Sequence, residues 1–163
     1  MEPQDFSFSS MDERSLNVLR KFRIVFNAVK THFQQVEKRV GLGGAQIWAL
    51  HVIYQSPGIG VKSLAKAMDI HQTTASNLVK SLLADRYIQL EKDENDRRTV
   101  QLYVLAAGQK ILRLAPGPYE GVLPNALKKM DSQTLARLDQ DLETLLALMG
   151  ADKRAAHIPL AQS

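Results

Sequence analysis

The sequence contains no cysteine among its 163 residues. A disulfide framework and a zinc site held by thiolates are therefore excluded. No apolar run approaches the roughly 18 residues of a membrane-spanning helix. The first residues also lack the basic and apolar regions of a signal peptide. We therefore expect a cytoplasmic protein that has no membrane partner.

The sequence also lacks the groupings that catalysis and cofactor binding usually need. It has no glycine-rich phosphate loop, and its four histidines, His32, His51, His71 and His157, are scattered. No Ser-His-Asp or paired-carboxylate grouping stands at a useful spacing. We expect no enzyme and no cofactor or resident metal. A metal-responsive protein stays an alternative, because His32 and His51 could meet in space near Glu37.

Charge by itself is a weak indicator of the partner. The net charge is +4 for the whole chain. The segment 61–105 has seven cationic and six anionic side chains, whereas 11–40 has seven cationic and three anionic ones. Any argument for nucleic acid must therefore depend on where charged and polar groups are placed.

The segment 61–105 has the pattern of two helices followed by a hairpin. Apolar residues recur at helical spacing in 61–68 and again in 71–84. They then alternate with polar residues in 88–90 and 100–104, which is the periodicity of strands. The predicted fold is mainly α with a small β-hairpin wing, a winged helix-turn-helix. This architecture indicates double-stranded DNA as the partner.

The second of these helices has side chains suited to reading base edges. A major groove needs short polar groups that let the backbone approach closely. The predicted DNA contacts on this helix are Gln72, Thr73, Thr74, Ser76, Asn77 and Lys80. Lys62, at the start of the preceding helix, is a further predicted contact. The alternative is an ordinary surface helix rich in threonine and serine.

The hairpin and the second helix resemble the multiple antibiotic resistance regulator (MarR) family of bacterial transcription factors. The similar residues are Leu64-Ala65, the run 70–83, the wing 93–98 and Gly108. The family's wing commonly reads Asp-Pro-x-Asp-Arg-Arg, and five of these six slots match. The resemblance implies a DNA-binding regulator whose flanking helices extend the similarity to nearly the whole chain.

The resemblance assigns roles to three wing residues. Arg98 is expected to enter the minor groove, and narrow A·T-rich grooves favour an inserted arginine. Asp96 is expected to hold the Arg98 guanidinium by a charge-assisted hydrogen bond, and Arg97 to contact a phosphate. The alternative is that Asp96 and Arg98 only tie a surface hairpin together.

The sequence departs from the family pattern at three places. Arg86 and Asp69 stand where the family usually has glycine, a residue that suits the left-handed conformation at a helix end. Val104-Leu105 stands where the family has Leu-Thr, so the usual threonine cap of the next helix is missing.

Two outer segments repeat apolar residues at alternating steps of three and four. Long helices with such seams pack against a helical partner. The seams are Leu19, Phe22, Phe26, Val29, Phe33, Val36 and Val40, then Leu135, Leu138, Leu142, Leu145 and Met149. We expect a homodimer whose recognition helices enter successive major grooves of a pseudo-palindrome, about 34–36 Å apart. The alternative is that both segments pack on their own chain.

The predicted organisation is one domain over 11–150. It comprises a DNA-binding lobe, 46–108, and a dimerisation lobe, 11–45 with 109–150. Loose tails are expected at 1–10 and 151–163. Pro116-Gly117-Pro118 should separate a helix over 106–115 from another over 119–130, because proline interrupts helices.

The resemblance further implies a repressor released by a small aromatic carboxylate or phenolic ligand bound between the lobes. The residues that could hold it are His32, Phe33, Trp48, His51 and Tyr54. The alternative is that the aromatic residues and His51 belong to the core. An architectural DNA-binding protein without a ligand is also possible, although the polar recognition helix argues against it.

Overall fold

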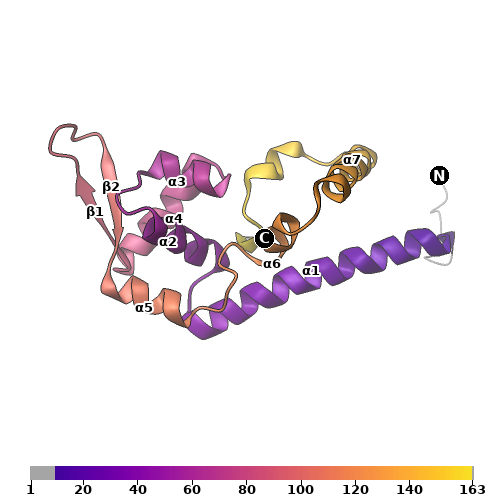
Figure 1. Ribbon diagram of the computed structural model, residues 1–163, viewed down its shortest axis with the longest axis horizontal. Coiled ribbons are helices and arrows are strands. Elements are labelled where there is room, and N and C mark those ends of the chain that lie inside the picture. Colours follow the sequence, from indigo (N-terminus) through magenta and orange to yellow (C-terminus); the bar gives the residue numbers. More distant parts are fainter. Residues whose placement is uncertain (1–9, 163) are drawn as a thin grey trace, which may run out of the picture.

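A computed structural model describes residues 10–162, which form a mainly helical chain with one two-stranded antiparallel sheet (Figure 1). The first half contains α1 (Glu13–Val40), α2 (Gly44–Gln55), α3 (Val61–Met68), α4 (Gln72–Ala84) and β1 (Ile88–Lys92). The second half contains β2 (Val100–Val104), α5 (Ala106–Leu114), α6 (Val122–Lys128), α7 (Ser132–Met149) and two 3-10 helices, η2 (Lys153–His157) and η3 (Leu160–Gln162). The predicted fold class, a winged helix-turn-helix with added helices, is confirmed.

The predicted DNA-binding lobe is built around α2, whose apolar residues are buried. Helices α3 and α4 pack on one side of α2, and α5 lies on the other (Figure 1). The buried side chains of this core include Ile47, Leu50, Ile53, Leu64, Met68, Leu78, Val79, Leu82, Ile88, Leu102 and Leu112. The members from Leu64 to Leu102 lie in the segments whose helical or strand periodicity predicted an inward face, whereas those of α2 and α5 were not predicted.

Helices α3 and α4 both end in a residue with a left-handed backbone. Asp69 has φ 53° and Arg86 has φ 59°. In each case the next residue donates back into the helix, from Ile70 N to Ala65 O at 3.0 Å and from Tyr87 N to Leu82 O at 3.0 Å. This is the Schellman arrangement, in which glycine is usual. The two non-glycine residues therefore change the local strain and leave the helix ends in place.

The wing is a regular antiparallel hairpin that is anchored at its base. Ile88 pairs with Val104 and Leu90 with Leu102. Ile88 and Leu102 are buried. Leu102 also exchanges backbone hydrogen bonds with the segment before α3, which forms a short bridge at Ile59. The hairpin therefore projects its tip from a base that is fixed to the core.

Helix α5 begins at Leu105 without a side-chain cap, as the sequence predicted. Its position depends on a close approach at Gly108. A Cβ at Gly108 would lie 2.4 Å from the Tyr87 carbonyl oxygen and 2.8 Å from Val104 Cγ1. Glycine is needed here so that the helix can touch the base of the wing.

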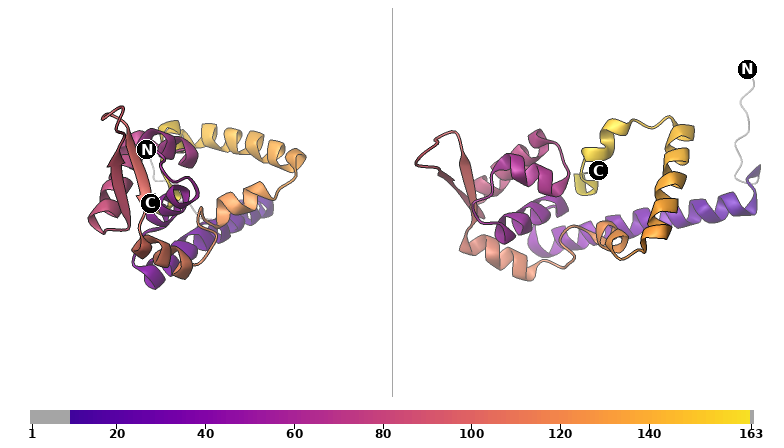
Figure 2. Two further views of the ribbon diagram at one scale, coloured as in Figure 1. Left: turned by 60° about the vertical axis from the view of Figure 1, so that its left-hand side comes forward. Right: turned by 45° about the horizontal axis from the view of Figure 1, so that its top comes forward.

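Helices α1 and α7 reach well beyond the DNA-binding lobe (Figures 1 and 2). Both begin at an aspartate cap, Asp12 or Asp131, and both end at a left-handed glycine, Gly41 or Gly150. Within the described residues, α7 has no buried side chain. None of the helices seen in 10–162 combines the length and apolar character that crossing a bilayer demands.

Two segments differ from expectation. After Pro116-Gly117-Pro118 the next helix begins at Val122, three residues later than predicted, because the Tyr119 hydroxyl bonds the Leu112 carbonyl and Gly121 has φ 104°. The expected loose tail over 151–163 is wrong for its described part, where η3 packs against the core through Ala161 and His157, at the end of η2, contacts the turn after α3. Of the other expected tail, residues 1–9 lie outside the described residues.

Candidate nucleic-acid interface

Helix α4 buries one face and exposes the face that the sequence predicted for DNA. Ala75, Leu78, Val79 and Leu82 are buried against the core. Of the predicted contacts on α4, Gln72, Thr73, Asn77 and Lys80 are exposed, and Thr74 and Ser76 are half-buried. The first turn carries no acidic side chain. The exposed face is therefore polar and compatible with an anionic partner.

Gln46 fixes α4 to the start of α2. Its amide nitrogen donates to Ser81 Oγ at 2.5 Å, and its Oε1 accepts from Gly43 N at 2.9 Å. One side chain thus caps α2 and holds the buried side of the recognition helix. This role was not predicted from the sequence, although a glutamine three residues after a helix cap is a known signal.

The tip of the wing is ordered by Asp96. Asp96 Oδ1 accepts from Arg98 N at 3.0 Å, and Oδ2 accepts from the Thr99 hydroxyl at 3.2 Å. The expected hydrogen bond from the Arg98 guanidinium to Asp96 is not formed among the described residues. The carboxylate instead holds the backbone turn, because an aspartate can accept from the N–H two residues on. Thr99 was not anticipated as its partner.

Both wing arginines are exposed, and neither forms an ion pair within residues 10–162. Arg97 and Arg98 therefore extend from a backbone turn that Asp96 fixes. Lys62 is exposed in the first turn of α3. The cations that the sequence predicted for DNA contact are thus solvent-accessible on the wing, α3 and α4.

The five residues predicted for an effector lie in separate environments. His32 is buried, with Nε2 3.1 Å from the Pro118 carbonyl oxygen to which it donates. The Phe33 ring packs against His32 at 5.5 Å. Phe33 and Trp48 line a cavity of about 200 Å³ between α1, α2 and the C-terminal segment.

His51 and Tyr54 line another cavity, of about 180 Å³, beside α5. The His51 ring stacks on Tyr119 with centroids 4.2 Å apart. Burial lowers the pKa of His51, and the nearby Glu120 carboxylate opposes part of this effect. The structure therefore does not bring the five predicted residues into one cavity.

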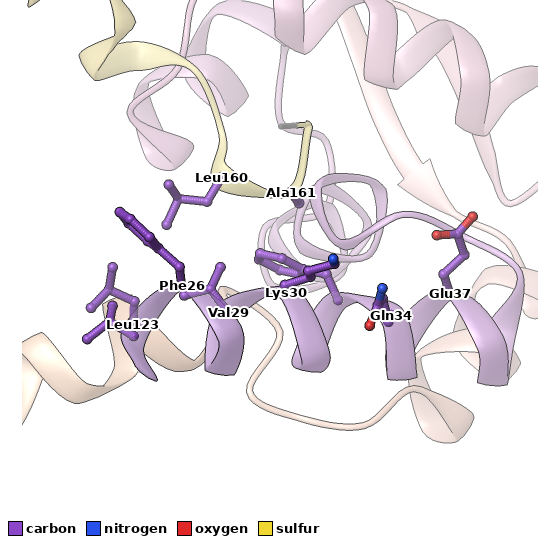
Figure 3. A pocket seen from close by; sticks show the side chains of 10 residues that line it. Phe26, Val29, Lys30, Gln34, Glu37, Leu123, Leu160 and Ala161 are labelled. Atoms are coloured by element: carbon purple, nitrogen blue, oxygen red, sulfur yellow. The ribbon is translucent and has the colours of Figure 1, made fainter. Parts of the chain in front are cut away.

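A larger cavity, of about 490 Å³, runs along α1. Figure 3 shows Phe26, Val29 and Lys30 of α1 on one side of it, with Leu160 and Ala161 of the C-terminal segment nearby. Leu160 and Ala161 were not predicted as site residues, because nothing local in the sequence indicates where a C-terminal segment will pack.

A metal centre finds no support in residues 10–162, where no three His, Asp or Glu side chains gather as metal ligands. The two histidines proposed for such a site have other partners. His32 donates to Pro118, and His51 stacks on Tyr119.

Residues 40–99 match the sequence profile of the MarR family. The chain is 28% identical over 98 residues to an uncharacterized HTH-type transcriptional regulator, YybA, from Bacillus subtilis (strain 168). That similarity covers 60% of this chain and 65% of YybA, so less than two thirds of the relative is spanned.

Two solved structures are similar in fold. A MepR-like protein complexed with pseudoligands has a TM-score of 0.57 at 17% identity, covering 87% of this chain and all of the other. Streptococcus pneumoniae FabT in complex with DNA has a TM-score of 0.55 at 18% identity, covering 85% of this chain and 98% of FabT. At these identities the similarity establishes the fold alone.

Proposed function

We propose that this chain is a DNA-binding transcription regulator of the MarR family, whose sequence profile matches residues 40–99. It acts as a homodimeric repressor on a pseudo-palindromic operator, and a small aromatic carboxylate or phenolic ligand releases it.

The observation that carries the proposal is the combined surface of α4 and the wing. The recognition helix exposes short polar side chains, and the wing that follows it in the sequence exposes Arg97 and Arg98. The polar side chains suit base edges in a major groove. The arginines suit the phosphate backbone and the adjoining minor groove. Together these groups form a surface for duplex DNA.

The dimer is supported by unfilled apolar surface on the outer helices. Leu19, Phe22 and Phe26 of α1 and Leu145 and Met149 of α7 line one cavity of about 500 Å³. Both sequence seams thus border a space that this chain does not fill. A second copy that supplies equivalent helices would fill it, as interlocking seams do in helical dimers.

Release by a ligand follows from the geometry that a dimer imposes. Two recognition helices bind together only when their spacing matches successive major grooves. A ligand that binds better to a dimer with a different spacing shifts the population away from the DNA-bound form. The crevice between α1 and α2, lined by Phe33 and Trp48, is the place where such a ligand would act on both lobes.

The proposal is tested by fluorescence anisotropy on DNA from upstream of the protein's own gene, with scrambled DNA of equal length as the control. We expect a preference of about a thousandfold or more at physiological salt. Benzoates, hydroxybenzoates and cinnamates are then added, and one of these classes is expected to abolish the preference. Absence of binding to both DNAs would overturn the proposed function.

A further inference from the structure

The C-terminal clasp, defined as residues 157–161, occupies the crevice between α1, α2 and the turn from α3 to α4. Pro159 is buried, and Ala161 packs against the hydrophobic core. A Cβ placed on Gly44 of α2 would lie 3.0 Å from Ala161 Cβ. Figure 2 shows this segment returning from the far end of α7 to the DNA-binding lobe. The clasp therefore links the outer helices to the core of the lobe.

The clasp also contacts the start of the recognition helix. The backbone N–H of His71, the cap residue of α4, donates to the His157 carbonyl oxygen at 3.3 Å. His157 Nδ1 lies 3.3 Å from Asp69 Oδ1, and the His157 and His71 rings meet edge to face at 5.5 Å. Because Asp69 ends α3, the clasp holds both sides of the helix-turn-helix corner.

The space left beside the clasp is small. Phe33 and Trp48 share the crevice with Pro159 and Leu160, and about 200 Å³ stays open. Ligand sites in proteins usually have volumes of about 300–1,000 Å³. A ligand that fills a site of that size therefore needs the room that the clasp occupies.

We propose that the clasp is a tethered occupant of this crevice that holds α4 in its DNA-binding position, and that an apolar ligand acts by displacing it. This inference rests on the proposed function. Gln72 and Thr73 stay exposed while the clasp is seated, so the base-reading face is open in this state. Displacement removes the contacts at His71 and Asp69, and the start of α4 then loses its link to the C-terminal segment.

The substitution Ala161→Glu tests the clasp in the full chain, because it places a charge against the apolar crevice. Ala155→Glu is the matched control, since Ala155 is exposed on η2. Trp48 is the only tryptophan and borders the clasp, so its emission reports displacement. For Ala161→Glu we expect longer-wavelength emission, faster amide exchange at residues 71–74 and DNA affinity lowered about fivefold or more. The control should match wild type in all three.

Two results would overturn the inference. Unchanged emission and exchange in folded Ala161→Glu protein would show that the clasp is not seated in solution. Changed emission and exchange with wild-type DNA affinity would show that the clasp has no role in DNA binding. If Ala161→Glu fails to fold, His157→Ala replaces it, and amide exchange as slow as wild type at residues 71–74 would then contradict the inference.

The first two readouts are made without DNA, which separates the clasp from the proposed function. If wild-type protein shows no preference for upstream DNA, the proposed function fails and the regulatory role fails with it. Emission and amide exchange still decide whether the clasp occupies the crevice.

Discussion

At the scale of single residues, Asp96 and Arg98 have different roles in the wing. Asp96 fixes the backbone turn through Arg98 N and the Thr99 hydroxyl, and the Arg98 guanidinium stays free of ion pairs within residues 10–162. Because the backbone turn is already fixed, only the Arg98 side chain has to be ordered when the guanidinium enters a groove. The two residues are therefore expected to act differently when replaced.

Arg98→Ala should weaken binding to operator DNA by about tenfold or more, a loss of roughly 1–3 kcal/mol. Thermal stability should stay near wild type, because the side chain is exposed and contacts nothing in the core. Lys110→Ala is the control, since it removes the same charge from α5, on the other side of α2 from α3 (Figure 1). Anisotropy titrations compare them, and equal affinities for the two variants would contradict the assignment.

His51 should make the stability of the fold depend on pH. Burial lowers its pKa in the folded state, so below its ordinary value of about 6.5 the unfolded chain takes up a proton before the folded chain does. Stability should therefore fall as the pH drops through 6.5 towards the lower folded pKa. His51→Phe keeps an aromatic ring against Tyr119 and removes the proton site. Urea unfolding at several pH values should show that the free energy of unfolding depends less on pH in this variant than in wild type. The same pH dependence in both proteins would exclude His51 as its source.

At the scale of secondary-structure elements, the end of the recognition helix carries backbone strain. Arg86 adopts φ 59°, which costs an L-residue about 1–2 kcal/mol relative to glycine. Arg86→Gly relieves this strain but gives the unfolded chain more freedom, so a net gain of up to about 1 kcal/mol is expected. Asp85→Gly is the control, because Asp85 has φ −83° and glycine there should destabilise. Denaturant unfolding gives the free energy of unfolding of both variants. A lower value for Arg86→Gly than for wild type would show that Arg86 is not strained.

The contact between α5 and the wing depends on a glycine without a side chain. Alanine is the better helix former, yet a Cβ at Gly108 would meet the Tyr87 carbonyl at 2.4 Å. That carbonyl accepts the Leu105 N–H at 2.9 Å and is backbone, so it cannot move aside cheaply. Gly108→Ala should destabilise the protein by about 1–3 kcal/mol. Gln109→Ala, at an exposed neighbouring position, should not destabilise the protein. Thermal melts compare the two variants, and a lower melting temperature for Gln109→Ala than for Gly108→Ala would exclude this packing.

At the scale of the whole molecule, the outer helices are incomplete without further apolar surface. Phe26 is 69% exposed on the α1 seam, and Ile24 is 67% exposed on the opposite side of the same helix. The two side chains are similarly exposed, but only Phe26 lies on the seam. Replacing each in turn therefore distinguishes an effect of the seam from an effect of any exposed apolar side chain. This pair therefore offers a direct test of the dimer.

Phe26→Asp should convert the dimer to monomer at micromolar concentration and weaken operator binding, because one subunit then presents a single recognition helix. Ile24→Asp should leave the dimer intact. Light scattering after size-exclusion chromatography gives the mass of each variant. Dimeric Phe26→Asp protein would show that the α1 seam is not the subunit interface.

The sequence by itself determined the elements of this protein and the surface proposed here to contact DNA. Helical periodicity, strand alternation and the acidic-arginine wing are local signals, because they depend on residues a few positions apart. They predicted the polar face of α4 and the exposed arginines, whereas the left-handed positions at Asp69 and Arg86 were indicated by the glycines of the family pattern.

Only the tertiary structure decided which distant segments meet. It separated His51 and Tyr54 from Phe33 and Trp48, gave Asp96 a backbone partner in place of a guanidinium, and brought residues 157–161 onto the start of α4. A crevice between α1 and α2 forms only after both helices pack, and any apolar segment of suitable length can enter it. No local sequence pattern specifies which segment packs into the crevice, because this depends on shape complementarity and burial over the whole chain.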